Sequence, residues 1–266
     1  MRPPSSVTQD DAIRLHEAQA PLFRERYRAQ ETDPYSSAFN YGRKKIGETI
    51  VAALGTDGRG RMVLDAGCGT GFFLRALEAR NFRVTGIDLA WEMLSRARED
   101  TGARIVFGDV AVLPFPPATF DAVVSVEVVR YLREPERAIV EYRRVLRPGG
   151  ICVITAASWL SSHGYAFANR VNAALHVTSR IKARQSFETT WTLRNKMIRA
   201  GLEDVSVEAR FLGPFVLVEK CFPRLTPRWL RRWEPLDDRV ADAYGFRNLS
   251  NHLIAVGRKP SLGGRA

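Results

Sequence analysis

The sequence has little cysteine and no long apolar run. Its three cysteines, Cys68, Cys152 and Cys221, form no C-x-x-C pair, so neither a disulfide framework nor a zinc cluster is predicted. The four histidines show no metal-ligand spacing, and we expect no metal. No apolar run approaches the roughly 20 residues of a spanning helix, and the first residues lack the apolar core of a signal peptide. These absences predict a protein of the reducing cytoplasm.

Acidic residues are scarce in the C-terminal part of the chain. Residues 1–150 carry a net charge of +2, whereas residues 151–266 carry +9. Such a bias can attract an acidic small molecule, an anionic membrane surface or nucleic acid, and it also occurs on ordinary solvated surfaces. With 266 residues, 45% of them hydrophobic, the chain can bury a real core, and one domain with insertions is the expected organisation.

A short apolar segment, residues 63–65, runs directly into three alternate glycines, Gly67, Gly69 and Gly71. Because glycine has no Cβ, the backbone can turn sharply there and approach a ligand, while the following helix points its free N–H groups at it. A second β-rich run ends in Asp88, 17 positions after Gly71, which is the distance that one crossover helix requires. The pattern predicts a nucleotide-binding site.

The acids around this loop indicate which nucleotide it binds. A dinucleotide fits poorly, because its fingerprint needs a glycine where this chain has Phe72. Asp65, two residues before the first glycine, would repel a pyrophosphate but suits a ligand that brings a cation. S-adenosylmethionine brings an ammonium and a sulfonium, and its ribose diol can donate hydrogen bonds to Asp88.

At these residues the chain resembles the class I S-adenosylmethionine-dependent methyltransferases, in the group that includes ubiquinone, sterol and natural-product methyltransferases. Four stretches carry the likeness, namely residues 63–71, 86–99, 108–125 and 142–150. The resemblance implies an α/β fold with a Rossmann-like, mostly parallel sheet whose last strand is antiparallel. It also implies N-terminal helices and two cap insertions.

The resemblance further implies the cofactor site. Asp65 and the glycine loop would hold the methionine part, Asp88 the ribose hydroxyls, and Asp109 with Val110 the adenine. Tyr41 and Arg43, ahead of the first strand, are further candidates, for which packing is the alternative role. The candidate cofactor-binding residues are Asp65, Gly67, Cys68, Gly69, Gly71, Asp88, Leu89, Asp109, Val110, Ser125, Tyr41 and Arg43.

The chain is predicted to be a single methyltransferase domain over residues 1–266. The N-terminal helices occupy residues 1–58, where Pro21 is expected to break the first helix before a short second one over 22–29. The cofactor-binding core is expected at 59–157, and segments 191–211 and 249–260 complete the sheet. Two stretches far longer than ordinary connections, 158–190 and 212–248, are interpreted as a substrate cap.

The second of these stretches contains a helical segment with Trp229 and Trp233 on one face and Arg231 and Arg232 beside them. Such a helix can lie on an anionic bilayer, close over an aromatic or lipid-like substrate, or simply pack the cap onto the core. Apolar residues nearby favour lipid, isoprenoid-quinone or polyketide acceptors over very polar ones. A peripheral membrane contact and a small-molecule acceptor are therefore the expected partners.

The chemistry follows from the cofactor. A sulfonium methyl is already a strong electrophile, so the enzyme chiefly aligns a nucleophile, excludes water and removes a proton where the nucleophile needs it. Glu127, Tyr131 and His163 are the candidate bases, and each also has an ordinary packing or hydrogen-bonding interpretation. The family often has a histidine where this chain has Tyr131.

Two other classes of function compete with this interpretation. A nucleic-acid methyltransferase would explain the basic C-terminal part. Amino-methylating members, however, usually carry an Asn/Asp-Pro-Pro-aromatic run where this chain has Ser-Val-Glu-Val at 125–128. A non-catalytic adenosylmethionine-binding protein would have no reason to keep acids at 65, 88 and 109. A small-molecule methyltransferase is therefore the function that the sequence favours.

Overall fold

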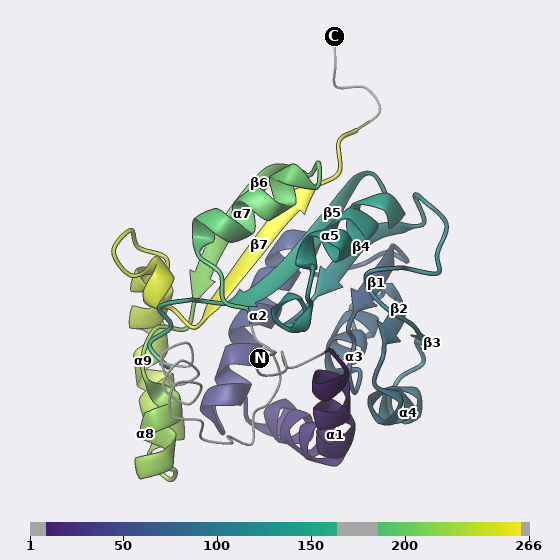
Figure 1. The fold of residues 1–266 in the computed structure, drawn as a ribbon. Coiled ribbons are helices and arrows are strands. Elements are labelled where there is room, and N and C mark those ends of the chain that lie inside the picture. Colours follow the sequence, from purple (N-terminus) through teal and green to yellow (C-terminus); the bar gives the residue numbers. More distant parts are fainter. Residues whose placement is uncertain (1–8, 164–185, 262–266) are drawn as a thin grey trace, which may run out of the picture.

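The computed structural model describes residues 9–163 and 186–261. Its centre is a seven-stranded sheet in the order β3-β2-β1-β4-β5-β7-β6 (Figure 1). The strands are β1 (Met62–Ala66), β2 (Arg83–Asp88), β3 (Arg104–Phe107), β4 (Phe120–Ser125), β5 (Leu146–Ala157), β6 (Glu203–Arg210) and β7 (His252–Arg258). The first five pair in parallel, and β7 runs antiparallel to both of its neighbours. The predicted Rossmann-like sheet with an antiparallel last strand is confirmed.

Helices cover both faces of the sheet, which explains why its central strands are apolar throughout. On one face, α2 (Ala38–Leu54), α3 (Phe72–Glu78) and α4 (Trp91–Asp100) contribute Ile46, Leu74 and Leu94 to a buried cluster. On the other, α5 (Pro135–Val145) and α7 (Thr190–Arg199) contribute Ile139 and Met197. Strands buried on both faces need apolar residues at every position. Only the carboxyl edge of the parallel strands is left for polar side chains.

The N-terminal helix differs from the expectation. It is one continuous helix, α1 (Gln9–Thr32), with Pro21 inside it, so the predicted break is wrong. An interior proline removes one backbone hydrogen bond and costs about 3 kcal/mol. Tertiary contacts on both sides of the proline offset this cost, because Ala20 packs in a cluster with Met93. Arg24 also forms an ion pair with Asp100 at 2.5 Å.

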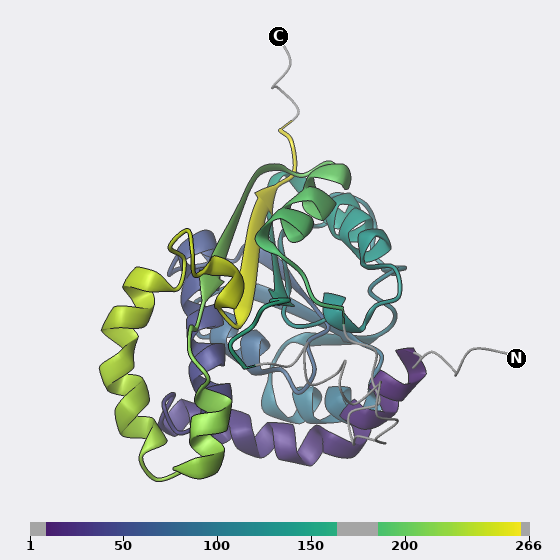
Figure 2. The ribbon, with the colours of Figure 1, turned by 60° about the vertical axis from the view of Figure 1, so that its left-hand side comes forward.

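The second long insertion is a pair of helices, α8 (Phe215–Cys221) and α9 (Thr226–Val240), followed by the 3-10 turn η2 (Arg247–Leu249). The two helices lie beside α2 at the edge of the molecule away from β3 (Figures 1 and 2). Of the first insertion, residues 158–163 and 186–190 are described, and the rest lies outside the described residues. The cap role of both insertions stays a prediction.

A buried ionic cluster fastens α9 to α2. Lys45, only 1% exposed, lies 2.6 Å from Glu234 and 2.7 Å from Asp238. On the same side of α2, the hydroxyl of Tyr41 donates to Asp237 at 2.8 Å, and both residues are buried. Because these contacts join segments almost 200 residues apart in the sequence, the second insertion is held as part of the main fold.

Candidate active site

The loop after β1 takes the conformation that only glycine adopts without strain. Gly67, Gly69 and Gly71 all have positive φ, at 86°, 53° and 82°. A Cβ at Gly67 would lie 2.1 Å from Cγ2 of Val128, so this glycine is required by packing. A Cβ at Gly69 would meet nothing within 4 Å. The side of Gly69 that glycine leaves bare is therefore open space at the cavity described below.

Asp88 fixes the position of this loop. It stands at the end of β2, and its two carboxylate oxygens accept hydrogen bonds from the backbone N–H groups of Gly69 and Ala90, each at 2.9 Å. Burial raises the pKa of the Asp88 carboxyl, and these two donors oppose the rise. A carboxylate oxygen has more than one acceptor site, so Asp88 can still accept from a ligand hydroxyl.

Asp65, at the carboxyl end of β1, is buried with one oxygen, Oδ2, that has no hydrogen-bond partner. Burial, and then the charge of Asp88, raise the pKa of Asp65 to about 8. The buried hydroxyl of Thr70, two turns of the loop further on, also has no partner. Buried polar atoms in folded proteins are rarely left unsatisfied. These two atoms therefore mark a place where a polar or cationic ligand completes the site.

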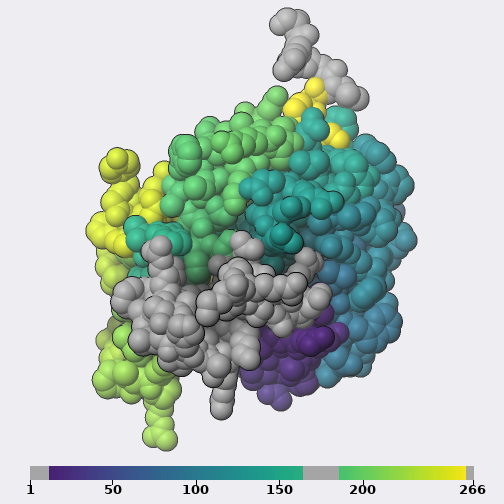
Figure 3. Space-filling model, viewed as in Figure 1, coloured from purple at the N-terminus to yellow at the C-terminus, as the bar shows by residue number. Residues whose placement is uncertain are grey.

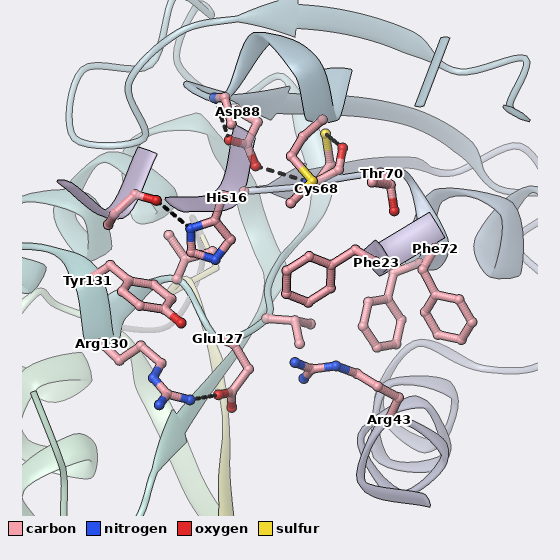
Figure 4. Close-up of a pocket in the computed structure, with 18 of the residues that line it drawn as sticks. His16, Phe23, Arg43, Cys68, Thr70, Phe72, Asp88, Glu127, Arg130 and Tyr131 are labelled. Atoms are coloured by element: carbon pink, nitrogen blue, oxygen red, sulfur yellow. Dashed lines mark hydrogen bonds and ion pairs between the residues drawn. The ribbon is translucent and has the colours of Figure 1, made fainter. Parts of the chain in front are cut away.

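A cavity of about 430 Å³ opens in front of the loop (Figure 4). It lies at the carboxyl edge of β1, β2 and β4, roofed by residues of α1 and α2. Of the predicted site residues, the following line it: Asp65, Gly67, Cys68, Gly69, Asp88, Leu89, Val110, Arg43, Glu127, Tyr131 and His163. The structure thus brings together residues from four separate parts of the chain.

Four predicted cofactor residues lie outside the lining. Gly71 stands behind the loop, where a Cβ would meet Ala97 at 3.2 Å. Asp109 turns its carboxylate onto the backbone N–H of Ala111. Ser125 is fully buried, with its hydroxyl 3.0 Å from that of Tyr142. The hydroxyl of Tyr41 is spent on Asp237, as described above. For these residues the expectation of ligand contact is corrected to a structural role.

Glu127 is the centre of a buried polar group at the far end of the cavity from Asp88 (Figure 4). It follows β4 with a strained φ of 62°, and its carboxylate lies 2.5 Å from Arg130, 3.3 Å from the Thr155 hydroxyl and 3.3 Å from Nδ1 of His252. Burial alone would raise the pKa of Glu127. The charges of Arg130, His252 and Arg43 override this and hold it well below its usual value. Glu127 is therefore a fixed anion.

The other two candidate bases lie on opposite sides of Glu127. Tyr131, in the 3-10 turn η1 (Val129–Tyr131), packs edge-on against His16 of α1, with ring centroids 4.9 Å apart. His163 packs edge-on against Phe211 at 5.1 Å. Burial, followed by the charge of His252, lowers the pKa of His163 to about 3, so its ring is neutral at neutral pH. All three candidates border the cavity, but only Glu127 is held charged.

Arg43 reaches into the cavity from α2 and points toward Glu127 (Figure 4). Its guanidinium stacks on the ring of Phe39, 4.9 Å from the centroid. Its Nε and Nη1 atoms are buried and have no hydrogen-bond partner. Because a guanidinium cannot lose its charge, these two N–H groups face the cavity as ready donors for an anionic group.

Sequence reasoning missed the aromatic wall of the cavity and one of its histidines. Phe23 and Tyr27 come from α1, and Tyr27 stacks on Phe72 with ring centroids 4.6 Å apart. His252, at the start of β7, joins the Glu127 group. The four-residue spacing of Phe23 and Tyr27 on a helix could have signalled a shared face. Nothing near His252 in the sequence indicates its partner 125 residues away.

Two features were searched for within residues 9–163 and 186–261. No group of three or more histidine, cysteine, aspartate or glutamate side chains in these ranges is arranged to hold a metal ion. In the same ranges, no helix combines the length and the apolar character needed to cross a bilayer.

Comparisons with known proteins agree with this geometry. A family model described as a methyltransferase domain matches residues 64–154. A malonyl-[acyl-carrier protein] O-methyltransferase of Serratia marcescens is 34% identical over 158 residues, which are 58% of this chain and 61% of that protein. The chain therefore spans less than two thirds of that relative.

A ubiquinone biosynthesis O-methyltransferase of Idiomarina loihiensis is 30% identical over 184 residues, covering 62% of this chain and 72% of that protein. Among solved structures, a SAM-dependent methyltransferase of Thermotoga maritima shares the fold with a TM-score of 0.62 at 21% identity. That match covers 92% of this chain and 99% of the other. The glycine loop, its acids and these likenesses together show that the chain belongs to the class I S-adenosylmethionine-dependent methyltransferases.

Proposed function

We propose that this protein transfers a methyl group from S-adenosylmethionine directly to a small, largely apolar acceptor. The observation that carries the proposal is a buried acid and a buried guanidinium in one cavity. Asp65 and Arg43 each present polar atoms that no protein group satisfies. The methionine end of the cofactor carries an ammonium and a carboxylate, which match these two charges.

The residues present fit the rest of the cofactor. Asp88 would accept hydrogen bonds from the ribose hydroxyls, and the bare side of Gly69 gives room for close approach. Leu89 and Val110 would enclose the adenine between apolar side chains. When bound, the cofactor supplies an electrophilic methyl group. The chain orients the acceptor and excludes water from the site.

The acceptor end of the cavity is mainly aromatic. Phe23, Phe39, Phe72 and Phe211 line it, beside the fixed Glu127 group. This lining favours lipid-like, quinone-like or polyketide-like acceptors over very polar ones. The relatives support a small or lipid-linked acceptor, since one is named for malonyl-[acyl-carrier protein] and another for ubiquinone biosynthesis.

The candidate bases differ in what each can do. Glu127 is held charged by Arg130 and is a weak base, so we assign it the orientation of its neighbours. His163 is neutral at neutral pH and can accept a hydrogen bond from an acceptor hydroxyl or amine without repelling the sulfonium. Tyr131 can position the acceptor against His16.

The proposal is tested with the purified protein. Isothermal titration should show binding of S-adenosylmethionine. Incubation with cell extracts and the cofactor should yield compounds heavier by one methylene unit in mass spectra. Cofactor binding without any methylated product would favour a non-catalytic binding protein, and the absence of cofactor binding would reject the proposal.

We expect the Asp88→Ala variant to bind S-adenosylmethionine about 1.5–3 kcal/mol more weakly, the usual value of a hydrogen bond to a charged group. The variant also frees the N–H groups of Gly69 and Ala90, so Asp88→Asn serves as the matched variant that keeps one acceptor oxygen. Calorimetric affinity measures both. Equal affinity in the wild type and Asp88→Ala would reject the ribose role.

Cofactor affinity should depend on pH through Asp65. A bound cation favours the charged carboxylate, so binding lowers the Asp65 pKa from its value of about 8 and releases a proton. Affinity should therefore rise with pH up to about 8, by at most about tenfold per unit. Above that pH it should fall, because the α-amino group of the ligand, with a pKa of about 8, loses its charge. Titrations from pH 6 to pH 9 should show this maximum, and Asp65→Asn should lack the rising limb.

A further inference from the structure

The turn between α8 and α9 exposes a group of large apolar side chains. Leu217 is 62% exposed, Phe222 52%, Leu225 40% and Trp229 37%. Phe222 and Trp229 pack edge-on with ring centroids 5.6 Å apart, so the two aromatic rings form one continuous apolar surface. Scattered exposed apolar residues are normal, but a contiguous group of this size marks an interaction site. We name these four residues the hairpin tip.

Exposed cations surround the hairpin tip. Residues 215–233 contain five basic residues and one acid, Glu219. Lys220, Arg224, Arg228 and Arg232 are exposed. The carboxylate of Glu219 is turned inward, where it accepts from the backbone N–H of Ala38 at 2.8 Å. The outer surface of the hairpin is therefore strongly positive as well as apolar.

Two residues of this helix that the sequence also suggested for membrane contact have other roles. Arg231 pairs with Asp33 at 2.7 Å and lies over the ring of Tyr35. Trp233 is half-buried, and its Nε1 donates to the carbonyl of Leu212 at 2.8 Å. They attach the hairpin to the fold, whereas Trp229 and Arg232 remain at the surface.

The inner side of the same hairpin borders the cavity. Val216 of α8 lines the cavity together with Phe211, which precedes the helix. The aromatic acceptor end and the hairpin tip are thus opposite sides of one short element, at the edge of the molecule shown at the left of Figure 2 and the lower left of Figure 3. A surface on which the tip rests would lie next to the acceptor end.

We propose that the hairpin tip docks on an anionic lipid bilayer, with Phe222, Leu225 and Trp229 entering the interface and the surrounding cations contacting lipid phosphates. Tryptophan prefers the boundary between headgroups and acyl chains, and basic residues near an anionic surface each strengthen binding. A nucleic acid would use the cations but not the aliphatic side chains. The docking itself is independent of the proposed methyl transfer; its role in delivering apolar acceptors rests on it.

The test is co-sedimentation of the full chain with phosphatidylcholine vesicles, with and without phosphatidylglycerol. We expect binding only to the anionic vesicles, falling with added salt. Arg224→Glu with Arg228→Glu should weaken it at least about 25-fold, because each basic residue is worth roughly fivefold and reversal adds repulsion. Phe222→Ser with Trp229→Ser should weaken it about tenfold or more.

Trp91→Ser with Arg98→Glu is the matched control. Trp91 is 51% exposed, and the Arg98 guanidinium lies 4.9 Å from its ring centroid, so the pair has the same chemistry on α4. This control should bind vesicles like the wild type, and all variants should keep calorimetric cofactor binding. Failure of the wild type to bind anionic vesicles at low salt would overturn the proposal. So would equal binding by the tip variants, or binding of RNA in place of vesicles.

Discussion

Replacing Gly69 by valine should abolish binding of S-adenosylmethionine and leave the fold intact. The side chain would enter the open space beside the glycine loop, where a Cβ meets no protein atom within 4 Å. The same space is needed for the close approach of the ligand to the backbone. We expect an affinity loss of at least 100-fold, or about 3 kcal/mol, by titration calorimetry. Because Gly69 has a φ of 53°, the variant should also lose about 1–2 kcal/mol of stability.

A matched control separates strain from ligand contact. Gly60 has a φ of 74°, and the nearest atom to a Cβ there lies 3.7 Å away, in Arg83. Gly60→Val should therefore suffer similar backbone strain far from the cavity and keep full cofactor affinity. Tight binding by Gly69→Val would show that the ligand does not approach this loop, and an equal loss in Gly60→Val would show that strain alone explains the effect.

Replacing Lys45 by alanine should destabilise the protein by about 3 kcal/mol, the low end of the range for removing one partner of a buried ion pair. Lys45 contacts three carboxylates, those of Glu48, Glu234 and Asp238, while being 1% exposed. The loss is not larger because Lys44 still pairs with Glu234 at 2.5 Å. Unfolding in urea measures the change, and the effect should appear as loss of the contact between α2 and α9.

Arg137→Ala is the control for an exposed pair. Arg137 lies 3.2 Å from Glu134, and both side chains are more than half exposed, so its removal should cost at most about 1 kcal/mol. A Lys45→Ala variant as stable as Arg137→Ala would mean that the cluster between α2 and α9 contributes little. In that case the apolar contacts around Phe211 and Phe215 would have to hold the hairpin instead.

Local patterns sufficed for the central sheet and the glycine loop because their causes are local. Apolar strands of fixed length, alternating with helices, allow few arrangements under right-handed crossovers. The glycines and the acids at 65 and 88 follow directly from strand ends, which meet at one edge of a parallel sheet. Pro21 shows the limit of this reasoning, since contacts with α4 outweigh the local penalty and α1 continues through it.

The sequence by itself determined the family, the sheet and the acids that line the cofactor end of the cavity. Only the tertiary structure decided that Tyr41 and Ser125 serve packing, that His252 joins Glu127, and that the α8–α9 turn exposes its apolar side chains beside a positive surface. The physical reason is distance along the chain. A strand or a loop is shaped by its neighbours in sequence, whereas the direction of a side chain at an interface depends on residues 17 to almost 200 positions away.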